Sequence, residues 1–334
     1  MNIHRTFGVE IECFSMISRA DLAMEIQRAF TDAGIGHHVN ATLWMQNRDS
    51  ENTTHWTVKT DSSLRHLSLP GTLFPMEIVT PVLKGEDGLK AIKVACSVIE
   101  RHCRVNKSCG LHVHHGVKRN ELASIGEAWI RAETFIMEAM PRSRRNNRYC
   151  REWNQFVNPG TGNVTSHPAI RTEKYRSLNI SSFIIRGTVE FRCHSGTVDC
   201  EKITNWVLVT QGLIEAACRN ENVDLNSIQD VARLIGSNGS DSQDLTDIRG
   251  QFKRNSIRAK MIEFLAESPR SWHELTQMVG RPPYKAIKVF KEKGLVSKDN
   301  EGRFHLNTEE AECNSMYSQA ADWLVSRYNQ FRTA

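Results

Sequence analysis

The sequence contains no C-x-x-C pair, although nine cysteines are scattered over its 334 residues. An odd number of dispersed cysteines indicates neither a disulfide framework nor a zinc knuckle. No apolar run approaches the length needed to cross a membrane, and the opening residues Met1–Arg5 do not resemble a signal peptide. We therefore expect a cytoplasmic protein with reduced thiols and no membrane partner.

Other common signals are missing as well. The chain has no Walker A sequence, and no G-x-G-x-x-G follows a predicted strand, which excludes a phosphate loop of either common kind. The net charge of +5 is too small to indicate a nucleic acid partner by itself, so any basic partner surface has to be local. A hydrophobic fraction of 40% is ordinary for a globular protein, and the length indicates two or more domains.

A histidine-rich strand is predicted over Cys109–Gly116. Because side chains alternate along a strand, Leu111 and Val113 point to a core while His112 and His114 share the opposite face. Residues two apart on a strand are separated by about 6–7 Å, so both imidazoles can serve one site. Imidazole binds metal ions and can hydrogen-bond phosphate oxygens. A polar strand edge that carries histidines without a site is the alternative.

Two other predicted strands carry carboxylates. The alternation of Thr6–Phe14 places Glu10 and Glu12 on one face, where two like charges favour a cation between them. Mg²⁺ suits such a pair because it prefers oxygen ligands, although a half-exposed strand with a polar outer face would show the same pattern. Met76–Pro81 carries Glu77 as its only charge, and a carboxylate buried there needs a cation, a proton or an exposed face.

A third polar stripe lies further along the chain. The strand that ends at His194 alternates strictly, so Glu190, Arg192 and His194 are predicted to share one face. The same period of two does not put Arg176 and Asn179 on one face, which indicates a bulge or a strand end near them.

The residues Pro141–Arg151 include five arginines in eleven positions. Guanidinium groups match the geometry of phosphates and carboxylates. We interpret this segment as a flap over a phosphate- or acid-binding site, with Arg144, Arg145 and Arg148 as its contacts. A solvated basic loop is the alternative.

The remaining pattern predicts an α+β fold. Amphipathic helices are expected at 19–33, 86–104, 120–140 and about 200–219. Antiparallel strands would align the polar stripes on one concave face of a sheet, with the helices on one face. Several carboxylates, imidazoles and arginines together are what a Mg²⁺–nucleotide site requires, because carboxylates hold the metal and arginines neutralise phosphates.

Five segments in this order resemble motifs of the amidoligase family, which is related to glutamine synthetase and the γ-glutamyl-cysteine ligases. They are Phe7–Glu12, Glu77–Pro81, Gly110–His114, Asn179 and Gly187–Arg192, and the resemblance covers roughly residues 5–215. It implies an antiparallel catalytic sheet like that of glutamine synthetase. It also implies an enzyme that uses ATP and Mg²⁺ to join a carboxylate to an amine through an acyl phosphate.

The resemblance further implies roles for individual residues. The metal ligands would be side chains of the polar stripes, namely Glu10, Glu12, His112, Glu190 and Glu77. Nucleotide phosphates would be bound by His114 and Arg176. Arg192, Arg176 and Glu77 would act on the reacting groups, with Arg192 contacting the acyl phosphate or the substrate carboxylate. The resemblance implies no role for His115 and His194.

The C-terminal third has a different pattern. We expect a catalytic domain at 1–235, a linker at 236–254, a winged-helix-like domain at 255–307 and a last helix at 308–334. Three helices precede a hairpin signal, and the third helix places Lys285, Lys288 and Lys291 outward. Such a helix suits nucleic acid binding and protein docking equally. The last helix would pack on the catalytic domain or on a second copy in a homo-oligomer.

The first functional hypothesis is therefore an ATP-dependent carboxylate–amine ligase. Its substrates would be a carboxylate and an amine, and the appended domain would select a peptide, a protein or a modified nucleobase. One alternative is a metal-dependent hydrolase that binds zinc or manganese tightly and turns over without ATP. Another is a DNA-binding regulator whose N-terminal domain only senses a nucleotide.

Overall fold

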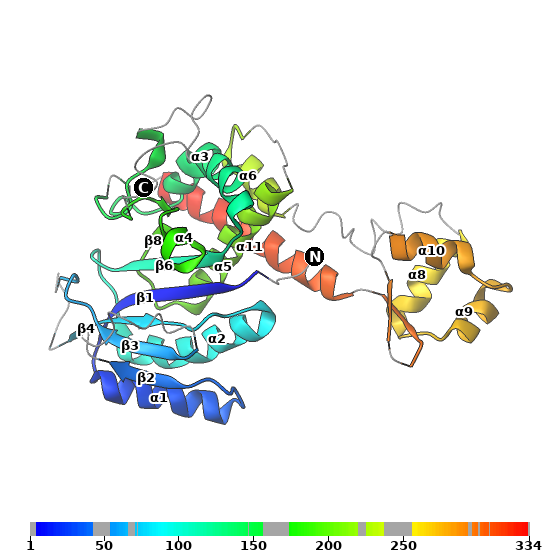
Figure 1. Cartoon of the computed structure of the whole chain (residues 1–334), viewed down its shortest axis with the longest axis horizontal. Helices are drawn as coiled ribbons and strands as arrows, with labels where there is room; N and C mark the ends of the chain where they lie inside the picture. The colour runs from blue at the N-terminus through cyan, green and yellow to red at the C-terminus, as the bar shows by residue number, and fades with distance from the viewer. Residues whose placement is uncertain are drawn as a thin grey trace. The chain divides into compact units, whose positions relative to one another are not determined.

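The computed structural model describes residues 5–42, 54–65, 71, 73–145, 147–155, 174–219, 225–236, 256–292, 296–299, 301–306 and 308–332 (Figure 1). The chain divides into a unit of Asn2–Ile235 with Gln319–Ala334, named the catalytic unit after the domain expected from the sequence, and a C-terminal unit of Gly236–Ser318. The predicted linker lies, after Gly236, outside the described residues. Over the described ranges, every helix is too short or too polar to span a membrane.

The catalytic unit is built on one mainly antiparallel sheet, as the α+β prediction expected. Among the described strands, only β2 and β3 pair in parallel, and β5 (Cys103–Arg104) pairs with β1 outside the main path. The strand order is β2 (Val39–Thr42), β3 (Trp56–Thr60), β4 (Phe74–Val79), β1 (Phe7–Ser15), β6 (Gly110–Gly116), β8 (Thr188–Ser195) and β7 (Leu178–Asn179). The three strands with polar stripes, β1, β6 and β8, are therefore neighbours.

All four predicted helices are present. They pack in a continuous layer, α1 against α2, α2 against α5, and α5 against α3 (Figure 1). Their bounds are α1 (Arg19–Asp32), α2 (Gly85–His102), α3 (Leu122–Glu138) and α5 (Cys200–Cys218). Ser18 caps α1 and Asp199 caps α5, each accepting a hydrogen bond from a first-turn backbone N–H. Shorter elements are η2 (Arg119–Glu121), η3 (Trp153–Gln155), α4 (Ser182–Arg186) and α6 (Ile228–Gly236).

Alternation on β1 and β6 separates a core face from a polar face. The ring of Phe7 faces α2, where a Cβ on Gly88 would come within 3.0 Å of it. His115 faces α5, and its Nε2 lies 2.8 Å from the hydroxyl of Thr210. His115 is thus a core residue, and the neighbouring His114 lies on the opposite, polar face.

A β-bulge in β8 changes one sequence-based prediction. Leu111 pairs with His194, but Val113 pairs with Phe191, so β8 contains one residue more than β6 at this point. Beyond the bulge the side chains change faces. The prediction that His194 shares a face with Glu190 and Arg192 is therefore wrong. His194 is fully buried, and the centroid of its ring lies 5.3 Å from that of Trp206 and 6.1 Å from that of Trp323.

The burial of His194 predicts a pH dependence of stability. Burial and the charges of Arg327, Arg144 and Lys202 lower the pKa of His194 to about 3. The unfolded chain, with an ordinary imidazole pKa, takes up a proton below about pH 6.5 that the folded chain excludes. The free energy of unfolding should therefore fall, by about 1.4 kcal/mol per pH unit from this residue, as the pH drops from about 6.5 towards 3. Urea unfolding of His194→Gln should show a shallower pH slope by this amount, and an unchanged slope would contradict the assignment.

The described residues 256–306 of the C-terminal unit form three helices followed by two antiparallel strands. Its core includes Met261, Leu275 and Phe290. The elements are α8 (Ile257–Glu267), α9 (Trp272–Val279), α10 (Tyr284–Glu292), β9 (Val296–Lys298) and β10 (Phe304–Leu306). The last helix, α11 (Thr308–Arg332), begins in this unit, and its residues from Gln319 onward belong to the catalytic unit.

Candidate active site

Strand pairing brings the predicted site residues side by side. Across the sheet, Glu77 on β4 pairs with Glu12 on β1, Glu10 on β1 pairs with His112 on β6, and His114 on β6 pairs with Glu190 on β8. Directly opposed residues in an antiparallel pair project from the same face. The stripes that lie far apart in the sequence therefore form one continuous patch, on the sheet face opposite Phe7 and His115.

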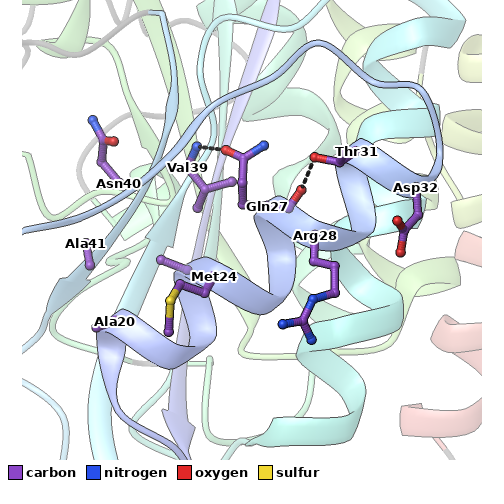
Figure 2. Close-up of a pocket in the computed structure, with 10 residues that line it drawn as sticks. Ala20, Met24, Gln27, Arg28, Thr31, Asp32, Val39, Asn40 and Ala41 are labelled. Atoms are coloured by element: carbon purple, nitrogen blue, oxygen red, sulfur yellow. Dashed lines mark hydrogen bonds between the residues drawn. The ribbon is translucent and has the colours of Figure 1, made fainter.

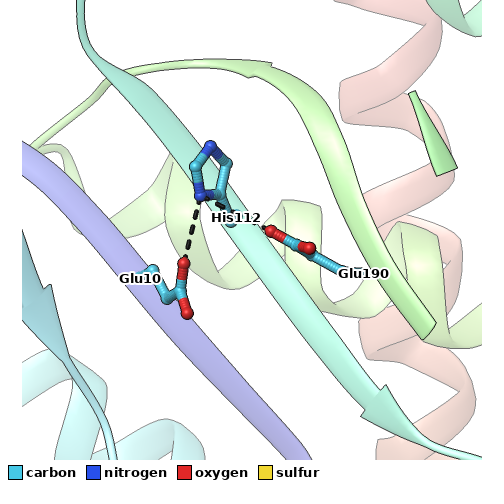
Figure 3. A group of neighbouring side chains, drawn as sticks. All are labelled: Glu10, His112 and Glu190. Atoms are coloured by element: carbon cyan, nitrogen blue, oxygen red, sulfur yellow. Dashed lines mark hydrogen bonds and ion pairs between the residues drawn. The ribbon is translucent and has the colours of Figure 1, made fainter. Parts of the chain in front are cut away.

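His112 is at the centre of this patch. Its Nδ1 lies 3.2 Å from Oε2 of Glu10 and 3.7 Å from Oε1 of Glu190, and Figure 3 shows these three side chains converging from β1, β6 and β8. Its Nε2 lies 3.6 Å from Oε1 of Glu12. In the part of the chain that the structure describes, ligand atoms within 4.8 Å of one another occur in two groups, Glu10–His112–Glu190 and Glu12–Glu77–His112. Each group offers two carboxylates and one imidazole to a cation.

His114 lies beside the first group. Its Nε2 is 3.3 Å from Oε1 of Glu10 and 3.8 Å from Oε1 of Glu190, and its Nδ1 is 3.2 Å from the hydroxyl of Thr188. Burial lowers the pKa of His114, but the charge of Glu190 and the hydrogen bond with Glu10 outweigh burial and raise it above the usual value. An imidazole in this setting can hold a proton next to an anion.

The surroundings of three carboxyl groups shift their pKa values in different directions. Burial raises the pKa of Glu10, but hydrogen bonds with His112 and His114 outweigh it and hold that pKa well below its usual value. Burial also raises the pKa of Glu190, and the attraction of His114 outweighs it and keeps the pKa low. For Glu77, burial and the charge of Glu10 raise the pKa to about 8. Glu10 and Glu190 are therefore anions at neutral pH, as cation ligands must be.

Three cationic side chains balance these carboxylates. The ammonium group of Lys59, directly opposite on β3, forms an ion pair with Glu77. Arg186 Nη1 lies 3.4 Å from Oε1 of Glu10. Arg192 forms an ion pair with Glu190 and is half-buried beside it. The sequence analysis assigned no role to Lys59, because the pairing of β3 with β4 cannot be read from one strand.

Asn179 is a second residue without a role in the sequence-based prediction. Its side-chain amide donates a 2.6 Å hydrogen bond to Oε2 of Glu190, and its own oxygen accepts one of 2.6 Å from Ser181. Asn179 therefore orients Glu190. Asn179 pairs with Glu190 across β7 and β8, which explains why Asn179 is one of the segments that resemble amidoligase motifs.

Arg176 lies apart from this patch. It is fully buried, its guanidinium carbon is 5.0 Å from the ring centroid of Trp153, and it is absent from the described residues that line the cleft. β7 contains only Leu178 and Asn179, so Arg176 precedes the strand, which agrees with the expected strand end. Its predicted contact with a nucleotide phosphate has no counterpart in this geometry.

The patch forms the floor of a cleft of about 960 Å³. The floor residues Glu10, Glu12, Glu77, His112 and Glu190 all line it. Exposed cations surround the floor, namely Arg65, Lys107, Arg148, Lys174 and Arg186. An acidic floor within a basic rim matches a divalent cation below a polyanionic ligand.

The arginine-rich segment supplies part of this rim, but its arginines differ. Arg144 is almost fully buried, and its guanidinium donates to the carbonyls of Arg192 at 2.6 Å and of Cys193 at 3.3 Å. Arg145 donates to the carbonyls of Glu138 and Met140 at the end of α3. Only Arg148 of the three is exposed, although all three line the cleft.

These contacts predict different effects of two substitutions, one on stability and the other on substrate binding. Arg144→Ala should lower the free energy of unfolding by about 1.5–3 kcal/mol, because it removes charge-assisted hydrogen bonds to buried carbonyls. Arg148→Ala should change it by less than about 0.5 kcal/mol and instead raise the Michaelis constant for the ATP or acid that the sequence leads us to expect in this cleft. Urea unfolding and steady-state kinetics of both variants separate the two roles. Equal stability losses would show that Arg148 also anchors the segment.

A second hollow, of about 520 Å³, lies between α1 and the edge strand β2 (Figure 2). Gln27 closes part of it by accepting a 2.9 Å hydrogen bond from the backbone N–H of Val39. Its ionisable lining side chains are Arg28 and Asp32. This hollow offers neither of the ligand groups found in the cleft, so the cleft is the candidate active site.

Comparison with known proteins supports the sequence motifs. Residues 4–158 match the family Amidoligase_2, described as "Putative amidoligase enzyme". No curated protein matches this chain. Among solved structures, the chain is similar to one described as the complex between prokaryotic ubiquitin-like protein Pup and its ligase PafA. That similarity has 12% sequence identity and a TM-score of 0.33 over 97% of this chain and 65% of the other.

This chain thus spans less than two thirds of the length of that matched chain. The family match includes Glu10, Glu12, Glu77 and the histidine strand, and it ends before β8. The amidoligase resemblance that the strand motifs indicated is confirmed over residues 4–158.

Proposed function

We propose that this protein is an ATP- and Mg²⁺-dependent carboxylate–amine ligase that acts through an acyl phosphate. The observation that carries the proposal is the convergence of two carboxylate–imidazole groups around His112 on the floor of one cleft. The amidoligase match over residues 4–158 supports the same reaction class.

The donor atoms fit divalent cations of the magnesium type. Each group contributes two carboxylates, and carboxylate oxygens are the ligands that Mg²⁺ prefers. Glu10 and Glu190 would hold one ion together with His112. Glu12 and Glu77 would hold another, which requires Glu77, with its pKa raised to about 8, to release its proton when the cation binds. Bound Mg²⁺ supplies charge neutralisation and orientation for the triphosphate.

The surrounding residues have separate tasks in this proposal. Arg192, fixed between Glu190 and the carbonyl of Tyr149, presents its guanidinium to the substrate carboxylate or to the acyl phosphate. His114 reaches a phosphate oxygen from beside Glu10. Asn179 keeps Glu190 in place. The carboxylate oxygen of the acid attacks the γ-phosphorus, ADP leaves, and the amine then displaces phosphate from the acyl carbon.

We also propose the domain organisation expected from the sequence, with a winged-helix-like domain at 255–307. The order of α8, α9 and α10 followed by the β9–β10 pair supports it. The division of the chain near Gly236 supports the boundary of the catalytic domain. The proposed substrates are a carboxylic acid and an amine, one of which can be part of a peptide, a protein or a modified nucleobase.

The reaction can be tested before the amine is known. Hydroxylamine replaces an amine as the attacking nucleophile and converts an acyl phosphate into a hydroxamate, which gives a coloured ferric complex. We expect hydroxamate and ADP to form together when the protein is incubated with MgATP, hydroxylamine and the correct member of a panel of carboxylic acids. Glu190→Gln should abolish both products, whereas Glu86→Gln, an exposed substitution on α2, should leave them unchanged.

The hydrolase hypothesis predicts a different result. Turnover of an ester or amide without ATP, stopped by a chelator and restored by zinc, would contradict the ligase proposal. Formation of ADP that does not depend on any acid would also contradict it.

A further inference from the structure

The outward face of α10 in the C-terminal unit carries three cations in a row. Lys285, Lys288 and Lys291 recur at every third residue, and all three are exposed. Tyr284, at the start of the helix, is 68% exposed. At a rise of about 1.5 Å per residue, the first and last lysine are separated by about 9 Å along the helix axis. We call these four residues the α10 basic face.

The opposite side of α10 fixes this orientation. Ala286, Ile287 and Phe290 are buried in the core of the unit, against residues of α8 and α9. Gly280, at a φ of +73°, ends α9 and lets the chain turn into α10. Because the apolar side is anchored, the α10 basic face cannot rotate inward without exposing Phe290.

The hairpin adds a further cation next to this face. The ammonium groups of Lys291 on α10 and Lys298 on β9 lie 5.7 Å and 5.6 Å from the centroid of the same ring, that of Phe304. Among the described residues, neither of these lysines nor Lys285 forms an ion pair with a carboxylate. Both ammonium groups lie near one ring, so this surface concentrates positive charge and favours a polyanionic partner.

We propose that the α10 basic face and Lys298 bind double-stranded DNA, with α10 in the major groove. The major groove of B-DNA admits an α-helix, whereas the deep, narrow major groove of duplex RNA does not. Lysines on a groove-bound helix and on an adjacent hairpin reach phosphates along its edges. This surface belongs to a unit that lacks the ligand groups of the cleft, so the proposal is independent of the ligase activity.

The test is the salt dependence of DNA binding by the full chain. A fluorescent 25-base-pair duplex of mixed sequence is titrated with the protein at several KCl concentrations, and binding is followed by anisotropy. The variant carries Lys285→Gln, Lys288→Gln and Lys291→Gln. We expect it to bind at least about tenfold more weakly at 0.1 M salt, and to reduce the slope of log K against log salt by about 0.9 for each lost phosphate contact.

The matched control removes the same charge elsewhere. Lys84→Gln, Lys90→Gln and Lys93→Gln replace three exposed lysines at and on α2, and this variant should retain the DNA affinity and salt slope of the unaltered protein. Equal losses in both variants would show that only net charge matters and would overturn the proposal. Binding of duplex RNA as tight as that of DNA, or no DNA binding at 0.05 M salt, would also overturn it. Circular dichroism verifies that both variants are folded.

Discussion

The substitution His112→Ala is expected to weaken the binding of divalent cations at both proposed positions and to abolish amide-bond formation. His112 contributes Nδ1 towards Glu10 and Glu190 and Nε2 towards Glu12, so its loss affects both groups at once. Altering the outer partners of a metal ligand already costs about 10–100-fold in affinity or activity, and loss of a ligand should cost more.

Manganese titration followed by electron paramagnetic resonance can distinguish the two positions, because Mn²⁺ accepts the same carboxylate and imidazole ligands. The unaltered protein should bind two ions. Glu12→Gln should weaken one and Glu190→Gln the other, while Glu86→Gln on the surface of α2 should weaken neither. Two ions bound by His112→Ala at unaltered affinity would refute the arrangement, as would the loss of the same ion in both glutamine variants.

Removal of residues 319–334 is expected to prevent stable folding of the catalytic unit. This part of α11 buries Leu324 and Tyr328, and Trp323 lies against the ring of His194. The guanidinium of Arg145 also reaches the carbonyl of Phe331 at 3.4 Å. Burial of a large apolar side chain contributes about 1.5–3 kcal/mol, so Leu324 and Tyr328 together contribute about 3–6 kcal/mol, against a typical stability of about 5–15 kcal/mol.

A single substitution keeps this prediction testable if the truncated chain cannot be purified. Leu324→Ala in the full chain should lower the free energy of unfolding by about 2–5 kcal/mol, because it leaves a cavity in a closed core. Asp322→Ala, on the exposed side of the same helix, should change it by less than about 0.5 kcal/mol. A truncated chain that unfolds at the same urea concentration as the full one would show that α11 is dispensable to this unit.

The cleft shows which residues of a site can be predicted from the alternation of single strands. Alternation along single strands identified Glu10, Glu12, Glu77, His112 and Glu190, because a period of two assigns faces without any knowledge of the partner strand. It assigned no role to Lys59 or Asn179, since each acts through a residue on a neighbouring strand. It misplaced His194, because a bulge arises from the pairing of two strands and not from the composition of one.

The arginine-rich segment illustrates a different limit. Charge density predicted three equivalent contacts to a phosphate or an acid, at Arg144, Arg145 and Arg148. The fold instead directs Arg144 and Arg145 to backbone carbonyls, because carbonyls at the end of a helix and at a bulge need donors when they are buried. Only contacts made after folding determine which arginines remain available to a ligand.

The amino-acid sequence by itself determined the class of the fold, the polar stripes, the order of the helices and the resemblance to the amidoligase family over residues 4–158. These depend on periodicity and motif order, which are properties of short segments. The tertiary structure alone decided that the stripes meet around His112, which arginines are committed to carbonyls, and that the end of α11 belongs to the catalytic unit. The physical reason is that strand register and helix docking are set by long-range packing, to which no single segment contributes enough information.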